Sequence, residues 1–306
     1  MYPVEIPSPI MPESASAKLV DTLRTDRIAQ LYRELYGYDA SEDFEGLSEI
    51  AVYECEGTGY RFYYPFHLEG KEKLYRAIED LEWTYQEGKW EHDTVVEHIP
   101  EGSSVLDVGC GRGAFLVKVK AKRSDKVTGI ELNKSAAAYA RERGIDVVEA
   151  LIGEHAKERP AFYDVITSFQ VLEHIANPIP FLRDCVAALK PGGLLVLAVP
   201  NNDGFLRFDP DAILNQPPHH VGLWNARSLA AIASLLPVSL ETIEEEPLRE
   251  VDWYRQVMER RYLPRRWQRS LYYRVGAHKI FARFIEENRQ TISGHTIIAY
   301  YRRQSS

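Results

Sequence analysis

Three alternate glycines follow a short apolar stretch near the middle of the chain. The stretch Val105-Leu-Asp-Val108 leads into Gly109, Gly111 and Gly113, and a run compatible with a helix begins at Ala114. Glycines allow a tight turn and a close approach of a ligand to the backbone, and the N-terminus of the following helix presents free N–H groups. The pattern therefore predicts a ligand-binding loop between a strand and a helix.

Two carboxylates near these glycines indicate the kind of ligand. Glu131 ends the next apolar stretch, where a carboxylate accepts two hydrogen bonds from a ribose diol. Asp107 stands two residues before the first glycine, where it suits a cationic ligand and is ill placed beside a pyrophosphate. We therefore expect a nucleoside-containing ligand. A dinucleotide is the alternative, because the loop also fits the G-x-G-x-x-G/A pattern, which alone is weak.

Together with two later motifs, the loop resembles that of the class I S-adenosylmethionine-dependent methyltransferases. The matching features are Asp-x-Gly-x-Gly-x-Gly at 107–113, the acid that ends the second strand, Leu-Glu-His at 172–174 and Lys-Pro-Gly-Gly at 190–193. The resemblance covers about residues 93–250 and the final strand. It implies a methyltransferase that uses S-adenosylmethionine as its cofactor.

Within that family, the chain is most similar to the small-molecule branch. Leu-Glu-His, Gln-Pro-Pro-His-His at 216–220 and Trp224 resemble ubiquinone O-methyltransferases and enzymes of bacterial surface-glycan and secondary-metabolite pathways. The aromatic segments at 60–65 and 89–91 resemble the glycan-associated members most. The resemblance therefore implies O-methylation of a sugar or glycan-pathway intermediate. A quinone, a lipid or a secondary metabolite is the alternative acceptor.

The resemblance also implies roles at the methionine end of the cofactor. The three glycines would line this end, and Asp107 would orient the loop or meet the ammonium group. Phe169 or its backbone would close over the same end.

At the adenosine end, the resemblance assigns Glu131 to the ribose hydroxyls and Leu132 to the adenine face. The acid that the family usually carries near the adenine amine has no good match in this chain, so Leu151 or Ile152 takes that place. The complete set of expected cofactor residues is Asp107, Gly109, Cys110, Gly111, Gly113, Glu131, Leu132, Ile152, Phe169 and Gln170.

Three histidines follow the strands whose ends would face this ligand. In methyl transfer from a sulfonium the electrophile is already activated, so the enzyme aligns the nucleophile and excludes water. A hydroxyl nucleophile must also lose its proton, and histidine is the usual base near neutral pH. The candidate catalytic residues are His174, His219 and His220. The alternative is that His174 caps a helix and the other two shape a loop.

A metal site is a second alternative for the same histidines. Some family members bind a divalent cation through Glu-x-x-Glu-His and a later His, but here Gln170 replaces the first Glu. The loss of a carboxylate weakens a Mg²⁺ site, and nitrogen ligands suit that hard ion poorly. We therefore expect no metal, with Glu173, His174 and His219 as the alternative ligand set.

Alternating strands and helices must position these residues. Strands are expected at 103–108, 126–131, 146–149, 163–169 and 194–200, with helices between them. Two later strands, 239–246 and 295–301, are expected to pair antiparallel. The predicted fold class is α/β. It is a Rossmann-like methyltransferase fold with a mostly parallel seven-stranded sheet and a C-terminal antiparallel hairpin.

Two segments add to this core. Residues 1–92 are predicted as an N-terminal α+β extension on the acceptor side, and residues 93–306 as the methyltransferase domain. The extension contains helices over 17–35 and 71–87 and a hairpin over 50–65. Residues 250–290 form a helical insertion. Of the 34 aromatic residues, 15 lie in the first hundred positions, which favours an aromatic acceptor pocket.

The charge of the chain is unevenly distributed. The formal net charge is −8, yet residues 251–290 carry 10 basic and 4 acidic side chains. Because the basic residues are confined to one insertion, a nucleic-acid partner is disfavoured.

An arginine cluster dominates the basic insertion. It consists of Arg260, Arg261, Arg265, Arg266 and Arg269. The cluster suits an anionic sugar or a sugar nucleotide. It also suits anionic lipid head groups at a peripheral membrane contact, for which related quinone methyltransferases use an insertion at this place. A solvated surface, or one paired with the acidic N-terminal segment, is the alternative.

Composition limits the remaining possibilities. No apolar run reaches the roughly 18–20 residues of a membrane span, and the N-terminus does not resemble a signal peptide. Cys55, Cys110 and Cys185 are unclustered, as is typical of a reducing compartment. We therefore expect a cytoplasmic protein with a small-molecule acceptor and predict no oligomeric state. A rival interpretation is a cofactor-binding scaffold without catalysis.

Overall fold

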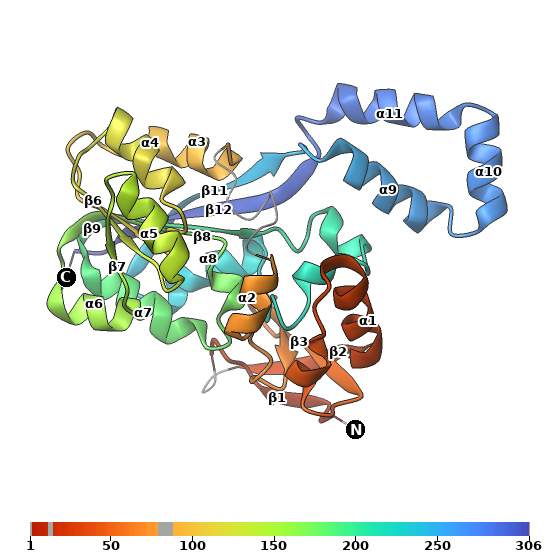
Figure 1. Ribbon diagram of the computed structural model, residues 1–306, viewed down its shortest axis with the longest axis horizontal. Coiled ribbons are helices and arrows are strands. Elements are labelled where there is room, and N and C mark those ends of the chain that lie inside the picture. Colours follow the sequence, from red (N-terminus) through yellow and green to blue (C-terminus); the bar gives the residue numbers. More distant parts are fainter. Residues whose placement is uncertain (1, 12–14, 79–87, 306) are drawn as a thin grey trace.

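A seven-stranded sheet forms the centre of the computed structural model, which describes residues 2–11, 15–78 and 88–305 (Figure 1). Its strands are β5 (Val105–Val108), β6 (Val127–Ile130), β7 (Asp146–Val148), β8 (Tyr163–Phe169), β9 (Leu189–Pro200), β11 (Val238–Pro247) and β12 (Ser293–Arg303). Their spatial order is β11-β12-β9-β8-β5-β6-β7. Only β12 runs antiparallel to its two neighbours. The predicted fold class, including the C-terminal antiparallel hairpin, is confirmed.

Two sets of helices cover the two faces of this sheet. One set is α3 (Trp90–Glu97), α4 (Ala114–Lys122) and α5 (Lys134–Glu142). The other is α6 (Ile152–Glu158), α7 (Pro178–Ala188) and α8 (Ala226–Leu235). A hydrophobic core lies on each face of the sheet. Consecutive strand residues point to opposite faces, so Tyr300 of β12 packs in the core under α3–α5 and Tyr301 packs in the core under α6–α8. The short helix α6 was not predicted, because Ile152 and Ala156 are the only hydrophobic residues that it buries.

A second, antiparallel sheet is built mainly from N-terminal residues. Its strands are β1 (Glu5–Pro7), β2 (Ser16–Arg24), β3 (Glu49–Cys55), β4 (Arg61–Tyr64) and β10 (Gly222–Leu223), in that spatial order. The hairpin predicted over 50–65 is confirmed as β3 and β4. Strand β10 comes from the segment after β9, so a later part of the chain supplies one edge of the N-terminal sheet.

The helix predicted over 17–35 is wrong in its first half. Residues 16–24 form β2, and α1 (Thr25–Tyr36) starts only after them. Leu19 and Leu23 are four positions apart, a spacing that fits a helix but also the alternation of a strand. Pairing decides between the two, since β2 bonds β1 on one side and β3 on the other.

The rest of the extension contains short helices. These are the 3₁₀ helix η1 (Ala40–Phe44) and the helix α2 (Glu72–Ile78), which confirms the start of the helix predicted over 71–87. Residues 79–87 of that prediction lie outside the described residues.

The basic insertion forms a helical arm between β11 and β12. Its helices are α9 (Val251–Tyr262), α10 (Arg266–Arg274) and α11 (Ala277–Asn288), and Figure 1 shows them projecting away from the two sheets. Pro264 lies between α9 and α10, where a proline cannot continue a helix. Helix α10 buries none of its residues, so the arm contacts the body mainly through α9. No helix among the described residues is long and apolar enough to cross a membrane.

Candidate active site

One cleft contains most of the residues that the sequence singles out. Its volume is about 1830 Å³, and residues at the carboxyl ends of β5, β6 and β8 line it. The chain runs from β5 to β6 on one side and from β8 to β9 on the other, so the cleft lies where α/β sheets bind ligands. Tyr75 of the N-terminal extension and Trp253 of the arm complete its wall.

The glycine loop has the backbone conformation for which glycine is needed. Gly109, Gly111 and Gly113 have φ angles of 80°, 53° and 75°, in the left-handed region that other residues avoid. A Cβ atom at Gly109 would lie 2.4 Å from Cγ2 of Val171. The loop therefore closes tightly and brings the N-terminus of α4 to the cleft.

Asp107 lines the cleft from β5 with 2% of its surface exposed. Its Oδ1 accepts a hydrogen bond of 2.8 Å from the Thr167 hydroxyl. Burial raises the pKa of Asp107 to about 7; the Thr167 hydroxyl and the Lys89 ammonium oppose that rise, and the charge of Glu131 adds to it. A bound cation would stabilise this carboxylate as an anion, as expected for the site of a positively charged ligand.

Glu131 lies directly after β6 and holds two loops together. Its Oε2 accepts from the Gly111 N–H at 2.8 Å, and its Oε1 accepts from the Asn133 N–H at 2.7 Å. A carboxylate has about four acceptor positions, so both oxygens retain capacity for a further hydrogen bond. This remaining capacity allows Glu131 to accept hydrogen bonds from a diol in the cleft.

Two exposed leucines lie in the cleft wall. Leu132 is 60% exposed and Leu151 is 58% exposed, whereas Ile152 is 5% exposed. Exposed apolar side chains in a cleft suit a flat aromatic group such as a purine. Of the two residues considered for the adenine amine, Leu151 offers the larger free surface.

Three further predicted cofactor residues, Cys110, Phe169 and Gln170, also line the cleft. Cys110 is buried, its Sγ lies 2.4 Å from where a Cβ of Gly129 would be, and burial raises its pKa. The Phe169 ring lies 4.9 Å from His92. Gln170 has a φ of 55°, so the chain turns sharply where β8 ends. Of the residues expected around the cofactor, all except Gly113 line this cleft.

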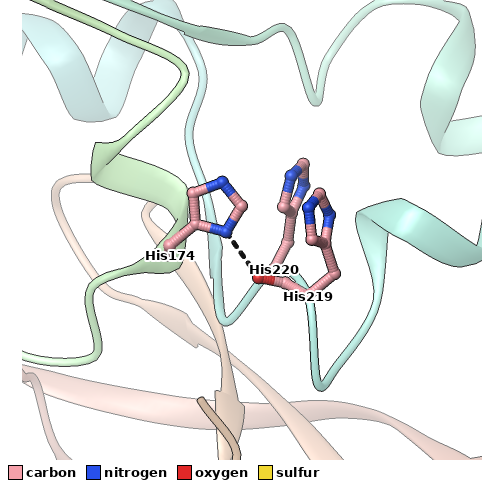
Figure 2. Close-up of side chains that lie close together, drawn as sticks. All are labelled: His174, His219 and His220. Carbon is pink, nitrogen blue, oxygen red and sulfur yellow. Dashed lines mark hydrogen bonds between the residues drawn. The ribbon is translucent and has the colours of Figure 1, made fainter. Parts of the chain in front are cut away.

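Figure 2 shows the three candidate histidines gathered in one cluster. One ring nitrogen from each histidine lies within 4.8 Å of the corresponding atoms of the other two. The rings of His219 and His220 are stacked, with centroids 4.6 Å apart, and the His174 ring crosses them edge-on. Residues from the ends of two different strands are thus united, as was predicted from the sheet topology.

Burial keeps these imidazoles neutral. It lowers the pKa of His174 to about 4 and that of His219 to about 3, and it also holds the pKa of His220 well below its usual range. Burial also raises the pKa of the adjacent Glu173 to about 8. Neutral imidazoles carry a nitrogen lone pair toward the cleft, so the cluster is able to accept a proton, a hydrogen bond or a cation.

The N-terminal extension positions the loop that carries His219 and His220. The buried Tyr32 of α1 donates to the carbonyl oxygens of Ile213 and Gln216, and its oxygen accepts from the His219 N–H at 3.4 Å. The 3₁₀ helix η4 (Ile213–Asn215) precedes this loop, and β10 follows it. The extension thus acts on the site through a specific anchor, which sequence patterns do not reveal.

The structure adds residues to the site that sequence reasoning missed. The Tyr75 hydroxyl lies 3.4 Å from Nδ1 of His174. Glu246 lines the cleft, and burial raises its pKa to about 7. Lys89, Trp253 and His295 also line it. A single tyrosine or glutamate in a helix or strand carries no spacing signal, so only the fold identifies them.

The arginine cluster lies outside the cleft, since none of its five members lines it. Among the described residues, the arm's arginines form ion pairs only within the arm and with Asp209. Asp209 belongs to the segment after β9, so these ion pairs give no support to pairing with the acidic N-terminal segment.

Comparisons with known proteins agree with this geometry. The sequence profile of the family described as "Methyltransferase domain" matches residues 83–236, about half of the chain. Ubiquinone biosynthesis O-methyltransferases of Vibrio vulnificus and Klebsiella pneumoniae are 35% and 37% identical over 108 and 109 residues. These matches cover 33% and 34% of this chain and 46% and 45% of the relatives. The chain thus spans about half the length of the curated relatives it matches.

A solved structure supports the fold. The complex between the Haloferax volcanii Trm112 methyltransferase activator and the putative methyltransferase contains a chain that superposes with a TM-score of 0.50 at 14% identity. The superposition covers 76% of this chain and 93% of that chain.

Proposed function

The chain belongs to the class I S-adenosylmethionine-dependent methyltransferase family, and from that premise we propose that it methylates a hydroxyl group of a small-molecule acceptor. The observation that carries the proposal is the cleft, in which the glycine loop, Asp107 and Glu131 face the same space as a cluster of three neutral histidines. One half fits a cationic nucleoside, and the other half fits a group that must lose a proton.

S-adenosylmethionine, when bound, supplies a methyl group on positively charged sulfur, and the C–S bond breaks with its electron pair left on sulfur. Asp107 meets the ammonium group or orients the loop that does so, and Glu131 accepts from the ribose hydroxyls. Leu132 and Leu151 enclose the adenine. These residues hold the ligand in one orientation, so that the nucleophile approaches from a fixed side.

The histidine cluster serves the acceptor. An imidazole nitrogen takes the hydroxyl proton while the acceptor oxygen forms its bond to the methyl carbon. A neutral ring has a free lone pair for the hydroxyl, and because burial also makes these rings weak bases, their hydrogen bond to the hydroxyl orients it as the proton leaves. The walls exclude bulk water with aromatic side chains that include Tyr75 and Trp253.

The leading acceptor proposal is a sugar or glycan-pathway intermediate. Aromatic walls stack on sugar rings, and the volume of about 1830 Å³ accommodates both a nucleoside and a second molecule. A phenolic quinone precursor is the alternative, because the curated relatives are named for ubiquinone biosynthesis. The two acceptor classes are distinguished by incubating the protein with methyl-labelled S-adenosylmethionine and each candidate acceptor, and by measuring which acceptor becomes labelled. Sustained turnover excludes the rival interpretation of a scaffold without catalysis. If none of the acceptors is methylated by protein that binds the cofactor, the proposal fails.

The affinity for the cofactor is expected to rise with pH. Below pH 7 the buried Asp107 is protonated and offers no charge to an ammonium group, whereas above pH 7 it is an anion. One such group changes the dissociation constant about tenfold between pH 6 and pH 8. Calorimetric titrations across this range measure the slope. Asp107→Asn removes the titrating group, so a slope that persists in this variant would contradict the assignment.

The arm is proposed as a contact for an anionic surface such as a lipid membrane. Its exposed residues include Trp267 at 59% and Ile280 at 74%, and Arg265 and Arg266 are exposed as well. An arm that carries both apolar and basic exposed side chains suits a membrane interface. Double charge reversal, Arg265→Glu with Arg266→Glu, is expected to abolish co-sedimentation with phosphatidylserine vesicles and to leave cofactor affinity unchanged. Equal co-sedimentation of the wild type and the variant would refute this role.

A further inference from the structure

The buried carboxylate of Asp209 lines the cleft but has no part in the proposed chemistry. It follows β9 in the chain, and 7% of its surface is exposed. Its Oδ2 accepts from the Trp253 indole N–H at 2.7 Å, and its Oδ1 accepts from Nη2 of Arg260 at 2.8 Å and from the Asp211 N–H at 3.2 Å. A buried charge persists only where it is paired and hydrogen-bonded, so these three donors fix the carboxylate in one orientation.

Two of these donors belong to the arm. Trp253 and Arg260 are seven positions apart on α9, which places both side chains on one face of the helix. The arm lies outside residues 83–236, which match the methyltransferase domain, whereas Asp209 lies inside them. The Asp209 side chain therefore joins the arm to the matched domain at the wall of the cleft.

The Trp253 indole is fixed by ring contacts as well as by its hydrogen bond. Phe205 packs against it edge to face, with centroids 4.9 Å apart, and the His295 ring lies 5.8 Å away. The indole is still partly exposed and lines the cleft. Asp209 thereby determines where the arm presents an aromatic surface to an acceptor.

Asp209 also opens the segment 209–216, which runs into η4 and then into the histidine loop. In η4, the carbonyl oxygen of Leu214 lies 2.9 Å from Nδ1 of His219. The next residue, Asn215, has its Oδ1 atom 3.1 Å from Nδ1 of His220. The orientation of both imidazoles thus depends on how the segment 209–216 is held.

The N-terminal extension holds the same segment through α1. Arg27 forms an ion pair of 2.6 Å with Asp211, and Tyr32 donates to the carbonyl oxygens of Ile213 and Gln216. Helix α1 and the arm both lie outside the residues that match the methyltransferase domain. Two additions to that domain therefore act on one short segment beside the histidine cluster.

From these contacts we infer that Asp209 is a positioning residue for the acceptor half of the cleft. It holds the Trp253 indole in the wall and the segment that orients His219 and His220, so the arm takes part in acceptor recognition. The inference rests on the proposed function in that these histidines face the acceptor. The expected cofactor residues lie in the other half of the cleft, so the affinity for S-adenosylmethionine should not depend on Asp209.

Hydrogen exchange of Asp209→Ala tests the positioning without any acceptor. The substitution removes both carboxylate oxygens, and Arg260 is 40% exposed, so water can solvate the charge that loses its partner. Mass spectrometry should show about 10–100-fold faster backbone exchange in peptides that cover residues 209–220, the factor that a hydrogen bond to a charged group contributes. Peptides that cover the glycine loop should exchange as in the wild type.

Two further variants separate positioning from a general loss of stability. Trp253→Phe keeps an aromatic ring and removes only the indole donor, so it should speed exchange over 209–220 by a smaller factor. Combined with Asp209→Ala it should add less than about twofold, because the bond is already absent. Asp252→Asn changes an exposed carboxylate on the same helix that does not line the cleft, and it should match the wild type.

Methyl transfer provides a readout that a merely structural role would not move. The probes are 3,4-dihydroxybenzoate as a phenol and uridine diphosphoglucose as a sugar. For a probe that is methylated, Asp209→Ala should lower kcat/KM about 10–100-fold, while the dissociation constant of S-adenosylmethionine stays within about twofold of the wild type. A general loss of folded protein would instead weaken both halves of the site.

The inference is overturned if Asp209→Ala and the wild type exchange equally over 209–220, or if kcat/KM for a methylated probe is unchanged. If protein that binds S-adenosylmethionine methylates neither probe, the proposed function fails for these two acceptor classes. The exchange result still decides, in that case, whether Asp209 positions the segment.

Discussion

Glu131→Ala is expected to weaken S-adenosylmethionine binding by about 100-fold. Hydrogen bonds to a charged acceptor contribute about 1.5–3 kcal/mol each, and a loss of about 2.7 kcal/mol corresponds to 100-fold in the dissociation constant. The substitution also removes the bonds from Glu131 to the Gly111 and Asn133 N–H groups. The glycine loop and the loop after β6 would then lose their common anchor.

Calorimetry on matched variants checks this expectation. Glu131→Gln keeps one carbonyl oxygen and should lose less affinity than the alanine variant. Glu142→Ala removes an exposed carboxylate of α5 that does not line the cleft, and it should bind like the wild type. Equal affinity of Glu131→Ala and wild type would show that the ribose is held elsewhere.

His174→Ala and His219→Ala are expected to reduce the turnover number of methyl transfer by about 10²–10⁴-fold, the range typical of a lost proton acceptor. The affinity for S-adenosylmethionine should stay within about twofold of the wild type, because the cofactor residues lie in the other half of the cleft. The measurement is the initial rate of label transfer at saturating cofactor.

A histidine outside the cleft serves as the control, because its replacement shows whether the loss of any histidine lowers the turnover number. His67→Ala should retain the wild-type rate, since this residue is exposed and outside the cleft. Unchanged turnover in both cluster variants would reject the role of the histidines in catalysis.

The cofactor half of the site was predictable because its determinants are local. The glycine loop, Asp107 and Glu131 lie at the ends of two adjacent strands, and a parallel sheet brings such ends to one edge. The apolar strands and the helices between them carry strong periodic patterns. The same rule predicts that His174 and the Pro-Pro-His-His loop lie close together, since both follow the carboxyl ends of strands.

The acceptor half depends on contacts that sequence patterns do not encode. The Tyr32 hydroxyl anchors the histidine loop by accepting from the His219 N–H, 187 positions away in the sequence. The residue spacing of neither segment predicts this bond. The apolar residues of strand β2 fit the period of a helix as well as that of a strand. Its strand pairing, which is non-local, settled the conformation.

The arginine cluster shows the limit of reasoning from charge alone. The sequence predicted the position of the basic insertion and its helical character. The charge pattern did not indicate whether the arginines face the cleft or the solvent. None of these arginines lines the cleft, although Arg260 is paired to Asp209, which does. The charge pattern therefore identified a basic surface, and only the structure showed where on the molecule this surface lies.

The most direct test of the central claim is calorimetry of the folded wild-type protein with S-adenosylmethionine and, separately, with NADH. We predict one equivalent of bound S-adenosylmethionine and no competing binding of NADH, because Asp107 favours a cation and disfavours a pyrophosphate beside the glycine loop. Absence of S-adenosylmethionine binding, or equally tight binding of NADH, would contradict the account.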